Sequence, residues 1–365
     1  MLRAAAILFV TFCTESALAQ VLSTSVGNTE ITEMAGGLDI PWAVGILPDG
    51  SFLVTERDGN LLYVQDGEAN AVSGAPKVAA SGQGGLLDVT IPRDFNKSRE
   101  VFLTFSKPQK GGAGTAVAVA RLSENGTRLT NLRVIFEASP GGSGGRHFGS
   151  RVVEANDGTL FITIGDRGDG PQAQDRSNVI GSVIRINRDG SVPSDNPFIG
   201  QAEIRPEIWS YGHRNPQGAD LDRRGRLWVS EHGARGGDEV NLVKPGANYG
   251  WPVISYGTHY SGEKIGEGTS KPGMEQPRLY WDPSIAPSGL MVYSGDMFPE
   301  WRGDIFVGSL KFDYIARLYG DPLREVEQIK GPETERVRDI VQAPDGAIWF
   351  ISVGQGAVYR LARSS

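Results

Sequence analysis

The stretch Asp157-Gly158-Thr159-Leu160-Phe161-Ile162-Thr163 contains the unit that decides the fold, a tight turn followed by a short strand of β-branched and aromatic residues. The same pattern recurs at four further places along the chain, 49–55, 224–230, 302–308 and 345–351. A further strand of similar composition, 100–105, fills the gap between the first two copies. The chain is therefore built from six related units.

Units that recur about every 40 to 80 residues are typical of propeller blades with insertions in their loops. The composition agrees, because 49 glycines beside 39% hydrophobic residues indicate many short strands joined by tight turns. A β-sandwich or a β-helix is the competing all-β architecture, but a sandwich has no reason to repeat one unit six times. The sequence predicts an all-β, six-bladed β-propeller with four-stranded antiparallel blades and no long amphipathic helix.

The first residues have the three parts of a secretory signal, namely Arg3, the apolar run 4–13 and Ala17-Leu18-Ala19 as the cleavage site. That run is about half of the roughly twenty residues that a membrane span needs. We expect cleavage of residues 1–19, leaving residues 20–365 as a single propeller domain without a membrane span, in the periplasm or secreted. Cys13 is the only cysteine, so the mature chain can form neither disulfides nor thiolate metal sites.

The formal net charge of −7, without a basic run, argues against nucleic acid and anionic membranes as partners. No Gly-x-Ser-x-Gly elbow is present, and the four histidines lack the spacing of zinc ligands. A Rossmann or P-loop fingerprint is also missing from the required context, which disfavours a nicotinamide cofactor. The chemistry is expected in the segments between the repeats, because propeller loops converge around the central channel.

The first such segment is Gly144-Gly145-Arg146-His147-Phe148-Gly149-Ser150, which precedes a repeat strand that ends in Asp166. A neutral imidazole can accept a proton from a substrate hydroxyl, and a carboxylate on its other nitrogen would fix its tautomer and raise its basicity. His147 and Asp166 are candidates for this pair. The alternative is that His147 is a structural histidine, which is the commoner role of a lone histidine.

Three other segments are rich in polar groups. In 211–218, Arg214 beside Asn215 suits a planar, anionic, carbonyl-rich ligand, although such a loop can also simply stabilise itself. Acids within glycine-rich backbone in 230–239, followed by 248–252, could supply oxygen ligands to Ca²⁺, or could form a solvated acidic loop. Lys311 and the pair Arg336 and Arg338 add cations, which are more often surface charges.

In their order along the chain, these segments resemble the soluble, pyrroloquinoline-quinone-dependent aldose (glucose/sorbosone) dehydrogenases. The resemblance runs from Gly37-Leu38-Asp39-Ile40-Pro41-Trp42 to the last repeat. It includes 82–88, the His147 segment, 212–218, 238–242 with 248–252, and 336–339. It implies a six-bladed propeller, the fold that the repeats also predict. It further implies an enzyme that uses pyrroloquinoline quinone (PQQ) and Ca²⁺ to oxidise aldose sugars at the anomeric carbon to lactones. The electrons would pass to an acceptor that is a dye in vitro and a cytochrome or quinone in the cell.

The resemblance also assigns roles to residues. His147 matches the catalytic base, Asp166 the carboxylate behind it, and Arg214 the group that stabilises the oxyanion that develops as hydride arrives. The residues that match quinone contacts are Gln83, Arg214, Asn215, Tyr260, Lys311, Arg336 and Arg338. The carbonyls of Gly233 and Ala234 match the catalytic calcium site, and Glu239 and Tyr249 match a second calcium site. Arg146 stands where some members of the family carry an acid, which leaves the preferred sugar open.

Two other functions fit a six-bladed propeller. A calcium-dependent lactonase or esterase would need a metal but no quinone, and a carbohydrate-binding or protein-interaction propeller would keep the scaffold without catalysis. A lactonase is expected to ring its channel with Asn, Asp and Glu ligands. This chain gathers Arg, Lys, Gln and His at the corresponding motifs, and this favours the dehydrogenase.

Overall fold

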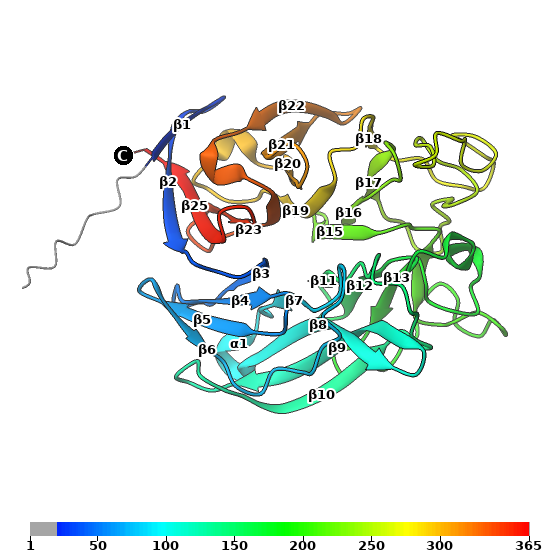
Figure 1. The fold of residues 1–365 in the computed structure, drawn as a ribbon, viewed down its shortest axis with the longest axis horizontal. Helices are drawn as coiled ribbons and strands as arrows, with labels where there is room; N and C mark the ends of the chain where they lie inside the picture. The colour runs from blue at the N-terminus through cyan, green and yellow to red at the C-terminus, as the bar shows by residue number, and fades with distance from the viewer. Residues whose placement is uncertain (1–19, 365) are drawn as a thin grey trace, which may run out of the picture.

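The computed structural model describes residues 20–364, which form six antiparallel β-sheets around one axis (Figure 1). The prediction of a six-bladed propeller is therefore confirmed. Five blades have the expected four strands, and the sixth carries a fifth strand at its outer edge. The expected leader, residues 1–19, lies outside the described residues.

The innermost strand comes first in the chain in the first five blades, and in the sixth only the two strands from the start of the described chain precede it. These six innermost strands contact one another around the axis (Figure 1). The first blade contains β3 (Pro41–Ile46), β4 (Phe52–Glu56), β5 (Leu61–Gln65) and β6 (Glu68–Ala71), and the second β7 (Leu86–Thr90), β8 (Glu100–Gln109), β9 (Gly112–Leu122) and β10 (Leu129–Glu137). The third contains β11 (Val152–Glu154), β12 (Leu160–Ile164), β13 (Ser182–Ile186) and β14 (Ile208–Tyr211), and the fourth β15 (Pro216–Leu221), β16 (Leu227–Glu231), β17 (Asp238–Leu242) and β18 (Leu279–Trp281). The fifth contains β19 (Pro287–Val292), β20 (Ile305–Ser309), β21 (Tyr314–Tyr319) and β22 (Arg324–Ile329). The sixth contains β23 (Val337–Gln342), β24 (Ile348–Ser352), β25 (Ala357–Arg363), β2 (Gly27–Ala35) and β1 (Gln20–Thr24).

The last blade closes the ring, because it combines the two ends of the described chain. Strand β2 pairs with β25 in antiparallel register from Thr29 opposite Arg363 to Ala35 opposite Val358. Strand β1 pairs only with β2, at the outer edge of the sheet. The main-chain hydrogen bonds between β2 and β25 therefore hold the first and last segments of the propeller together.

Each repeat seen in the sequence is the second strand of a blade, namely β4, β8, β12, β16, β20 or β24. The glycine of the repeat lies in the turn that joins the first strand to the second. In the third blade, Gly158 has φ of +83°, a conformation that glycine adopts without steric cost. The carboxylate of Asp157 accepts hydrogen bonds from the backbone N–H and the hydroxyl of Thr159, at 3.0 and 2.7 Å. This local hydrogen bonding explains why an Asp-Gly-Ser/Thr turn recurs.

Helical structure is limited to short turns in the described chain: α1 (Phe95–Ser98), η1 (Gly170–Gln174), η2 (Pro299–Trp301) and η3 (Pro332–Thr334). Among residues 20–364, no helix has the length and apolar character needed to cross a membrane. The longest stretch without a strand joins β17 to β18, from 243 to 278, and it projects from the fourth blade (Figure 1). This insertion is important below because it covers part of the site.

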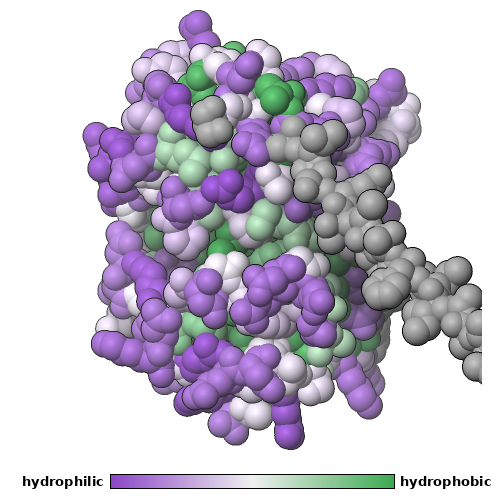
Figure 2. All heavy atoms as spheres, turned by 90° about the vertical axis from the view of Figure 1, so that its left-hand side faces the viewer, coloured by the Kyte–Doolittle hydropathy of each residue, from purple (hydrophilic) through white to green (hydrophobic). Residues whose placement is uncertain are grey.

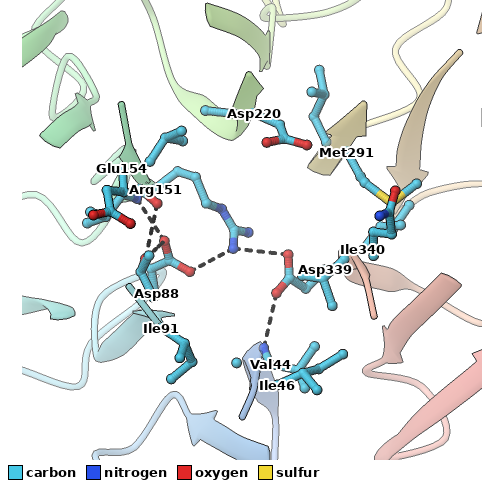
Figure 3. Close-up of a pocket in the computed structure, with 18 of the residues that line it drawn as sticks. Val44, Ile46, Asp88, Ile91, Arg151, Glu154, Asp220, Met291, Asp339 and Ile340 are labelled. Atoms are coloured by element: carbon cyan, nitrogen blue, oxygen red, sulfur yellow. Dashed lines mark hydrogen bonds and ion pairs between the residues drawn. The ribbon is translucent and has the colours of Figure 1, made fainter. Parts of the chain in front are cut away.

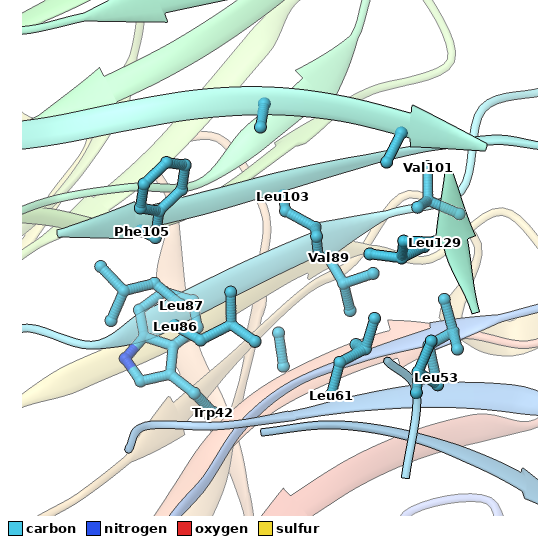
Figure 4. Packing of buried hydrophobic residues seen from close by; sticks show 14 of the residues in the cluster. Trp42, Leu53, Leu61, Leu86, Leu87, Val89, Val101, Leu103, Phe105 and Leu129 are labelled. Carbon is cyan, nitrogen blue, oxygen red and sulfur yellow. The ribbon is translucent and has the colours of Figure 1, made fainter. Parts of the chain in front are cut away.

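The apolar core lies in the seams between neighbouring blades. Between the first two blades, Trp42, Leu53 and Leu61 belong to the same buried cluster as Leu103 and Phe105 (Figure 4). Burial of each such side chain contributes about 1.5 to 3 kcal/mol. On the outside, polar residues predominate on the face shown in Figure 2, and apolar residues are scattered. The seams explain why the middle strands are buried on both faces.

Buried carboxylates from every second blade link its innermost strand to that of the neighbouring blade (Figure 3). Asp88 accepts a hydrogen bond from the backbone N–H of Val152 at 2.7 Å, Asp220 from that of Val292 at 2.8 Å, and Asp339 from that of Val44 at 3.1 Å. The Nη1 atom of Arg151 lies 2.7 Å from Asp88 and 3.0 Å from Asp339. Three pairs of inner strands are thus joined by side chains as well as by their own sheets.

These charged groups line a cavity of about 500 Å³ at the end of the channel formed by the C-terminal ends of the inner strands. Burial alone would lower the pKa of the Arg151 guanidinium, but Asp339 and Asp88 raise it above its usual value. Asp220 has no such ion pair, and burial raises the pKa of its carboxyl to about 6. Burial also raises the pKa of Asp88, although Arg151 opposes this. The channel axis therefore contains two carboxyl groups with a raised pKa, of which only Asp220 lacks an ion pair with Arg151.

Candidate active site

The predicted site residues lie at the opposite end of the channel from this cavity. Gln83, His147 and Arg214 precede the innermost strands β7, β11 and β15, whereas Asp166 and Ala234 follow the second strands β12 and β16. Because first and second strands are antiparallel, the start of one and the end of the other lie at the same edge of a blade. The topology thus brings these residues together although they are far apart in the chain.

A cavity of about 630 Å³ opens at this edge. Its lining contains Gln83, Arg146, His147, Asp166, Gly168, Gly170, Pro171, Arg214, Ala234, Trp251, Pro252, His259, Tyr260, Ile265 and Gly266. The structure therefore brings together six of the residues named from the sequence, and it adds the segment between β17 and β18 as one wall. A concave site with a few converging polar groups is the usual form of a small-molecule site.

His147 and Asp166 form the expected pair. The Nδ1 atom of His147 lies 2.6 Å from Oδ1 of Asp166, and both residues are buried. The same carboxylate oxygen accepts the backbone N–H of Gly168 at 2.7 Å, and Oδ2 accepts the indole N–H of Trp251 at 2.8 Å. With Nδ1 engaged, the Nε2 atom of His147 has no hydrogen-bond partner among the described residues and is available to a ligand.

Trp251 was not assigned a role from the sequence. It lies 85 positions after Asp166, on another blade, and only the fold places its N–H on that carboxylate. Its ring also lies 5.2 Å from the guanidinium carbon of Arg214. The Gly-Trp-Pro motif marked the segment as special, but no signal in the sequence indicated this contact.

The backbone around His147 adopts an unusual conformation. His147 has φ of +57°, a left-handed conformation that is uncommon for residues other than glycine. Its backbone N–H donates to Oε1 of Gln83 at 2.7 Å, which fixes this conformation. A side chain at Gly165 would place Cβ only 2.2 Å from the carbonyl oxygen of His147. Glycine at 165 is thus required for the His147 loop to pack against the end of β12.

The protonation states favour a neutral imidazole beside an ionised carboxylate. Burial lowers the pKa of His147, and the charges of Arg214 and Arg146 add to this, while Asp166 acts in the opposite direction. Burial by itself would raise the pKa of Asp166, but hydrogen bonds, the largest of them with His147, hold it below its usual value. A neutral histidine held by a carboxylate is the state that a general base requires.

Arg214 also lines the cavity and is buried. Its Nη1 atom donates to the carbonyl of His232 at 3.2 Å, and its buried Nε has no hydrogen-bond partner in the described part of the chain. Burial also lowers the pKa of its guanidinium. Asn215 lies beneath the cavity rather than in its lining, with its Oδ1 accepting the N–H of Gly149 at 3.2 Å. Its direct role in this structure is to hold the His147 loop.

Three of the predicted cations lie outside the lining of this cavity. Lys311 and Arg336 are exposed, while Arg338 is half-buried and donates to Oε1 of Gln217 at 2.7 Å. Burial, together with Arg336 and Arg151, lowers the pKa of Arg338 to about 10. His232 is affected by both Arg214 and Arg338. Burial and the charges of these two arginines lower the pKa of His232 to about 3. These cations repel one another, so an anion bound among them would be stabilised.

The residues matched to calcium lie beside a second, small cavity of about 20 Å³, lined by Gly233, Glu239 and Tyr249 among others. Burial next to Glu231 raises the pKa of Glu239 to about 8. The Nδ2 of Asn241 donates to both carboxylates, at 2.9 and 3.1 Å. The hydroxyl of Tyr249 is already used, because it donates to the carbonyl of Leu242 at 2.7 Å. Ala234 instead lines the large cavity.

These carboxyl and carbonyl oxygens are the ligands that Ca²⁺ prefers, and a cation would relieve the repulsion between Glu231 and Glu239. Within residues 20–364, no cluster of three or more His, Cys, Asp or Glu residues is arranged to hold a metal. A calcium ion here would therefore depend on backbone carbonyls in addition to carboxylates. The donor set is compatible with that kind of site.

Comparisons with known proteins identify the class of protein. The family model described as "Glucose / Sorbosone dehydrogenase" matches residues 38–360, so this chain belongs to that family of oxidoreductases. The aldose sugar dehydrogenase YliI of Escherichia coli is 41% identical over 344 residues, covering 92% of this chain and 93% of that protein.

Solved structures give the same result. The crystal structure of the soluble aldose sugar dehydrogenase of Escherichia coli in the apo-form has a TM-score of 0.87 and 40% identity, covering 92% of this chain and 99% of that one. The PQQ-bound form of an aldose sugar dehydrogenase from Streptomyces coelicolor has a TM-score of 0.77 and 25% identity, covering 92% and 98%.

Proposed function

We propose that this protein is a PQQ- and calcium-dependent aldose dehydrogenase that oxidises sugars at the anomeric carbon to lactones. The carrying observation is the buried His147 and Asp166 pair, whose imidazole presents a free Nε2 to a cavity shared with Arg214. The family and the PQQ-bound relative support the choice of reaction. A lactonase would need a metal but not this base beside a cluster of arginines.

The residues present fit a planar quinone that carries three carboxylates. Arg214 has an unpartnered buried Nε, and Lys311, Arg336 and Arg338 supply further positive charge at the same end of the channel. Calcium would be held by the carbonyls of Gly233 and Ala234, with Glu239 and the Tyr249 segment forming a second site. When bound, the quinone would supply the hydride acceptor and calcium a Lewis acid beside it.

The protein's own groups would then act on the sugar. The Nε2 atom of His147 accepts the proton of the anomeric hydroxyl as the C–H bond breaks and the C=O bond of the lactone forms. Asp166 holds the imidazole in the required tautomer and stabilises the imidazolium that results. Arg214 stabilises the negative charge that develops on the acceptor side. Gln83 acts indirectly, because it fixes the backbone of His147.

The decisive experiment is reconstitution of the purified chain with PQQ and Ca²⁺, followed by aldose-dependent dye reduction and identification of the lactone. We expect dye reduction that needs the quinone, the metal and the sugar together. No reduction with any aldose, together with metal-dependent hydrolysis of lactones, would instead establish the lactonase. Binding of sugars without either reaction would indicate a carbohydrate-binding propeller.

We further propose that the protein acts in the periplasm or outside the cell and passes its electrons to a cytochrome or a quinone there. The secretory pattern of residues 1–19 supports this placement. Expression of the full chain, cell fractionation and N-terminal sequencing test it directly. A mature N-terminus at Gln20 in the exported fraction is the expected result, and retention of Met1 in the cytoplasm would contradict it.

A further inference from the structure

Arg146 is a cation of the large cavity that the proposed chemistry does not use. It is exposed, it lines the same cavity as the neighbouring His147, and its side chain forms no hydrogen bond or ion pair with the described residues. The side chain lies across Gly168, where a Cβ would come within 2.5 Å of the Nε atom of Arg146. The absence of a side chain at 168 therefore leaves room for the Arg146 guanidinium beside the base.

No acid of the cavity lining is left to pair with Arg146. Asp166 is the only acid in the lining, and its carboxylate is occupied by His147, Gly168 and Trp251. Arg214 lines the same cavity, and the proposed chemistry already uses its charge to stabilise the acceptor. The neighbouring Arg167 is buried behind the loop, where it donates to the carbonyls of Arg146, Gly144 and Ala113. Arg146 is thus a positive charge beside His147 that forms no ion pair with the described residues, in a chain of net charge −7.

We propose that Arg146 gives the enzyme a preference for aldoses that carry a carboxylate, the uronic acids, over their neutral counterparts. This inference rests on the proposed function. A guanidinium is planar and matches a carboxylate with two parallel hydrogen bonds, which is a better match than it makes with a neutral hydroxyl. The sugar would place its anomeric hydroxyl at Nε2 of His147 and its carboxylate toward Arg146.

The kinetic test compares kcat/KM for glucuronate with that for glucose, and galacturonate with galactose, in the quinone-loaded enzyme. We expect a preference for the uronate of about five-fold or more, the size of a partly exposed charge-assisted contact. The ratio should fall toward one in Arg146→Gln and be partly retained in Arg146→Lys. High salt should reduce it, because an exposed ion pair is screened. Arg324→Gln is the matched control, an exposed arginine on the outer strand β22.

A binding measurement separates recognition from turnover. Methyl glycosides of glucuronate and glucose have no free anomeric hydroxyl, so calorimetry with the loaded protein reports affinity without reaction. We expect the wild type to bind the glucuronide more tightly than the glucoside, and Arg146→Gln to bind the two equally. Glucose 6-phosphate distinguishes a carboxylate preference from a general preference for anions. If it equals or exceeds glucuronate, the assignment to carboxylates is overturned.

Two failures can be told apart. Oxidation of neutral aldoses with no uronate preference, or with a ratio that Arg146→Gln leaves unchanged, overturns this inference and leaves the proposed function intact. No oxidation of any aldose overturns the proposed function, and the calorimetry then still decides whether Arg146 recognises a carboxylate.

Discussion

The buried pair of His147 and Asp166 shows how the surroundings set the protonation state of one residue. The imidazole is held neutral by burial and by two nearby arginines, while its Nδ1 is held by a carboxylate that has two further donors. A histidine on a solvated loop would have neither constraint. The charge state of His147 therefore depends on burial and on its neighbours Asp166, Arg214 and Arg146, and it could not be inferred from the residue type alone.

Loss of the base is the first prediction at this scale. We choose His147→Asn rather than alanine, because φ at this position is +57° and asparagine tolerates a left-handed conformation better. Turnover of the reconstituted enzyme should fall by roughly 10² to 10⁴, the usual contribution of a general base. Titration with quinone should show retained binding. Full activity of a variant that binds quinone and melts like the wild type would remove His147 from the mechanism.

Trp251 is expected to act as a positioning residue through Asp166. Trp251→Phe removes the donor to Oδ2 and leaves a buried carboxylate oxygen unsatisfied, which should lower kcat/KM by about tenfold. With one donor fewer, Asp166 attracts the proton of His147 more strongly, so the acid limb of the pH profile should move to higher pH. The control is Trp228→Phe on β16, which removes a similar indole hydrogen bond to Asp222. An unshifted acid limb in Trp251→Phe would argue against this role.

At the scale of elements, the innermost strands are joined by carboxylates of alternate blades (Figure 3). Each aspartate satisfies a backbone N–H of a neighbouring inner strand, where the channel leaves no other partner. Only two of the three form an ion pair with Arg151. The third, Asp220, lacks that ion pair, and burial raises its pKa to about 6, which makes the channel sensitive to pH.

The prediction for Asp220 follows from linkage. Because its folded pKa is about 6, the native state holds a proton that the unfolded state has lost between roughly pH 4 and 6. This group therefore lowers the free energy of unfolding as pH rises through that window, with a slope of at most about 1.4 kcal/mol per pH unit. In Asp220→Asn, the contribution of this carboxyl to the change of the free energy of unfolding with pH should disappear. Denaturant unfolding at several pH values measures it, and identical slopes in both proteins would contradict the assignment.

At the scale of the whole molecule, the ring is closed by strand pairing between its two ends. No disulfide can perform this closure, because the only cysteine is Cys13 and we expect its removal with the leader. The pairing of β2 with β25 takes its place. Stability of all six blades is therefore expected to depend on a segment far from the site.

Truncation tests this dependence. Removal of 20–35 takes away β1 and β2 and exposes the edge of β25, so we expect a large fall in Tm and loss of cooperative unfolding. Removal of 20–24 takes away only β1, which pairs with β2 alone, and should cost much less. Thermal melting of both truncated proteins provides the comparison. Equal melting temperatures would show that the closure is not essential.

The sequence by itself determined the fold class and the identity of the candidate base. Five turn-and-strand units and one further strand were enough to predict six blades, because the β-branched strand recurs in every blade and the glycine turn in five of them. The motifs around His147, Arg214 and Ala234 were also visible, and the structure places all three in one cavity. The fold class and the candidate base could be predicted because turns, strands and motifs are visible as short local patterns in a fixed order along the chain.

Only the tertiary structure decided which groups touch. It placed Trp251 on Asp166, set Asn215 under the loop instead of in the lining, and left Lys311, Arg336 and Arg338 outside the cavity of His147. It also revealed the free Arg146 and the carboxylates along the axis. The physical reason is that these contacts join different blades, so they depend on ring closure and the packing of the seams, which no local pattern encodes.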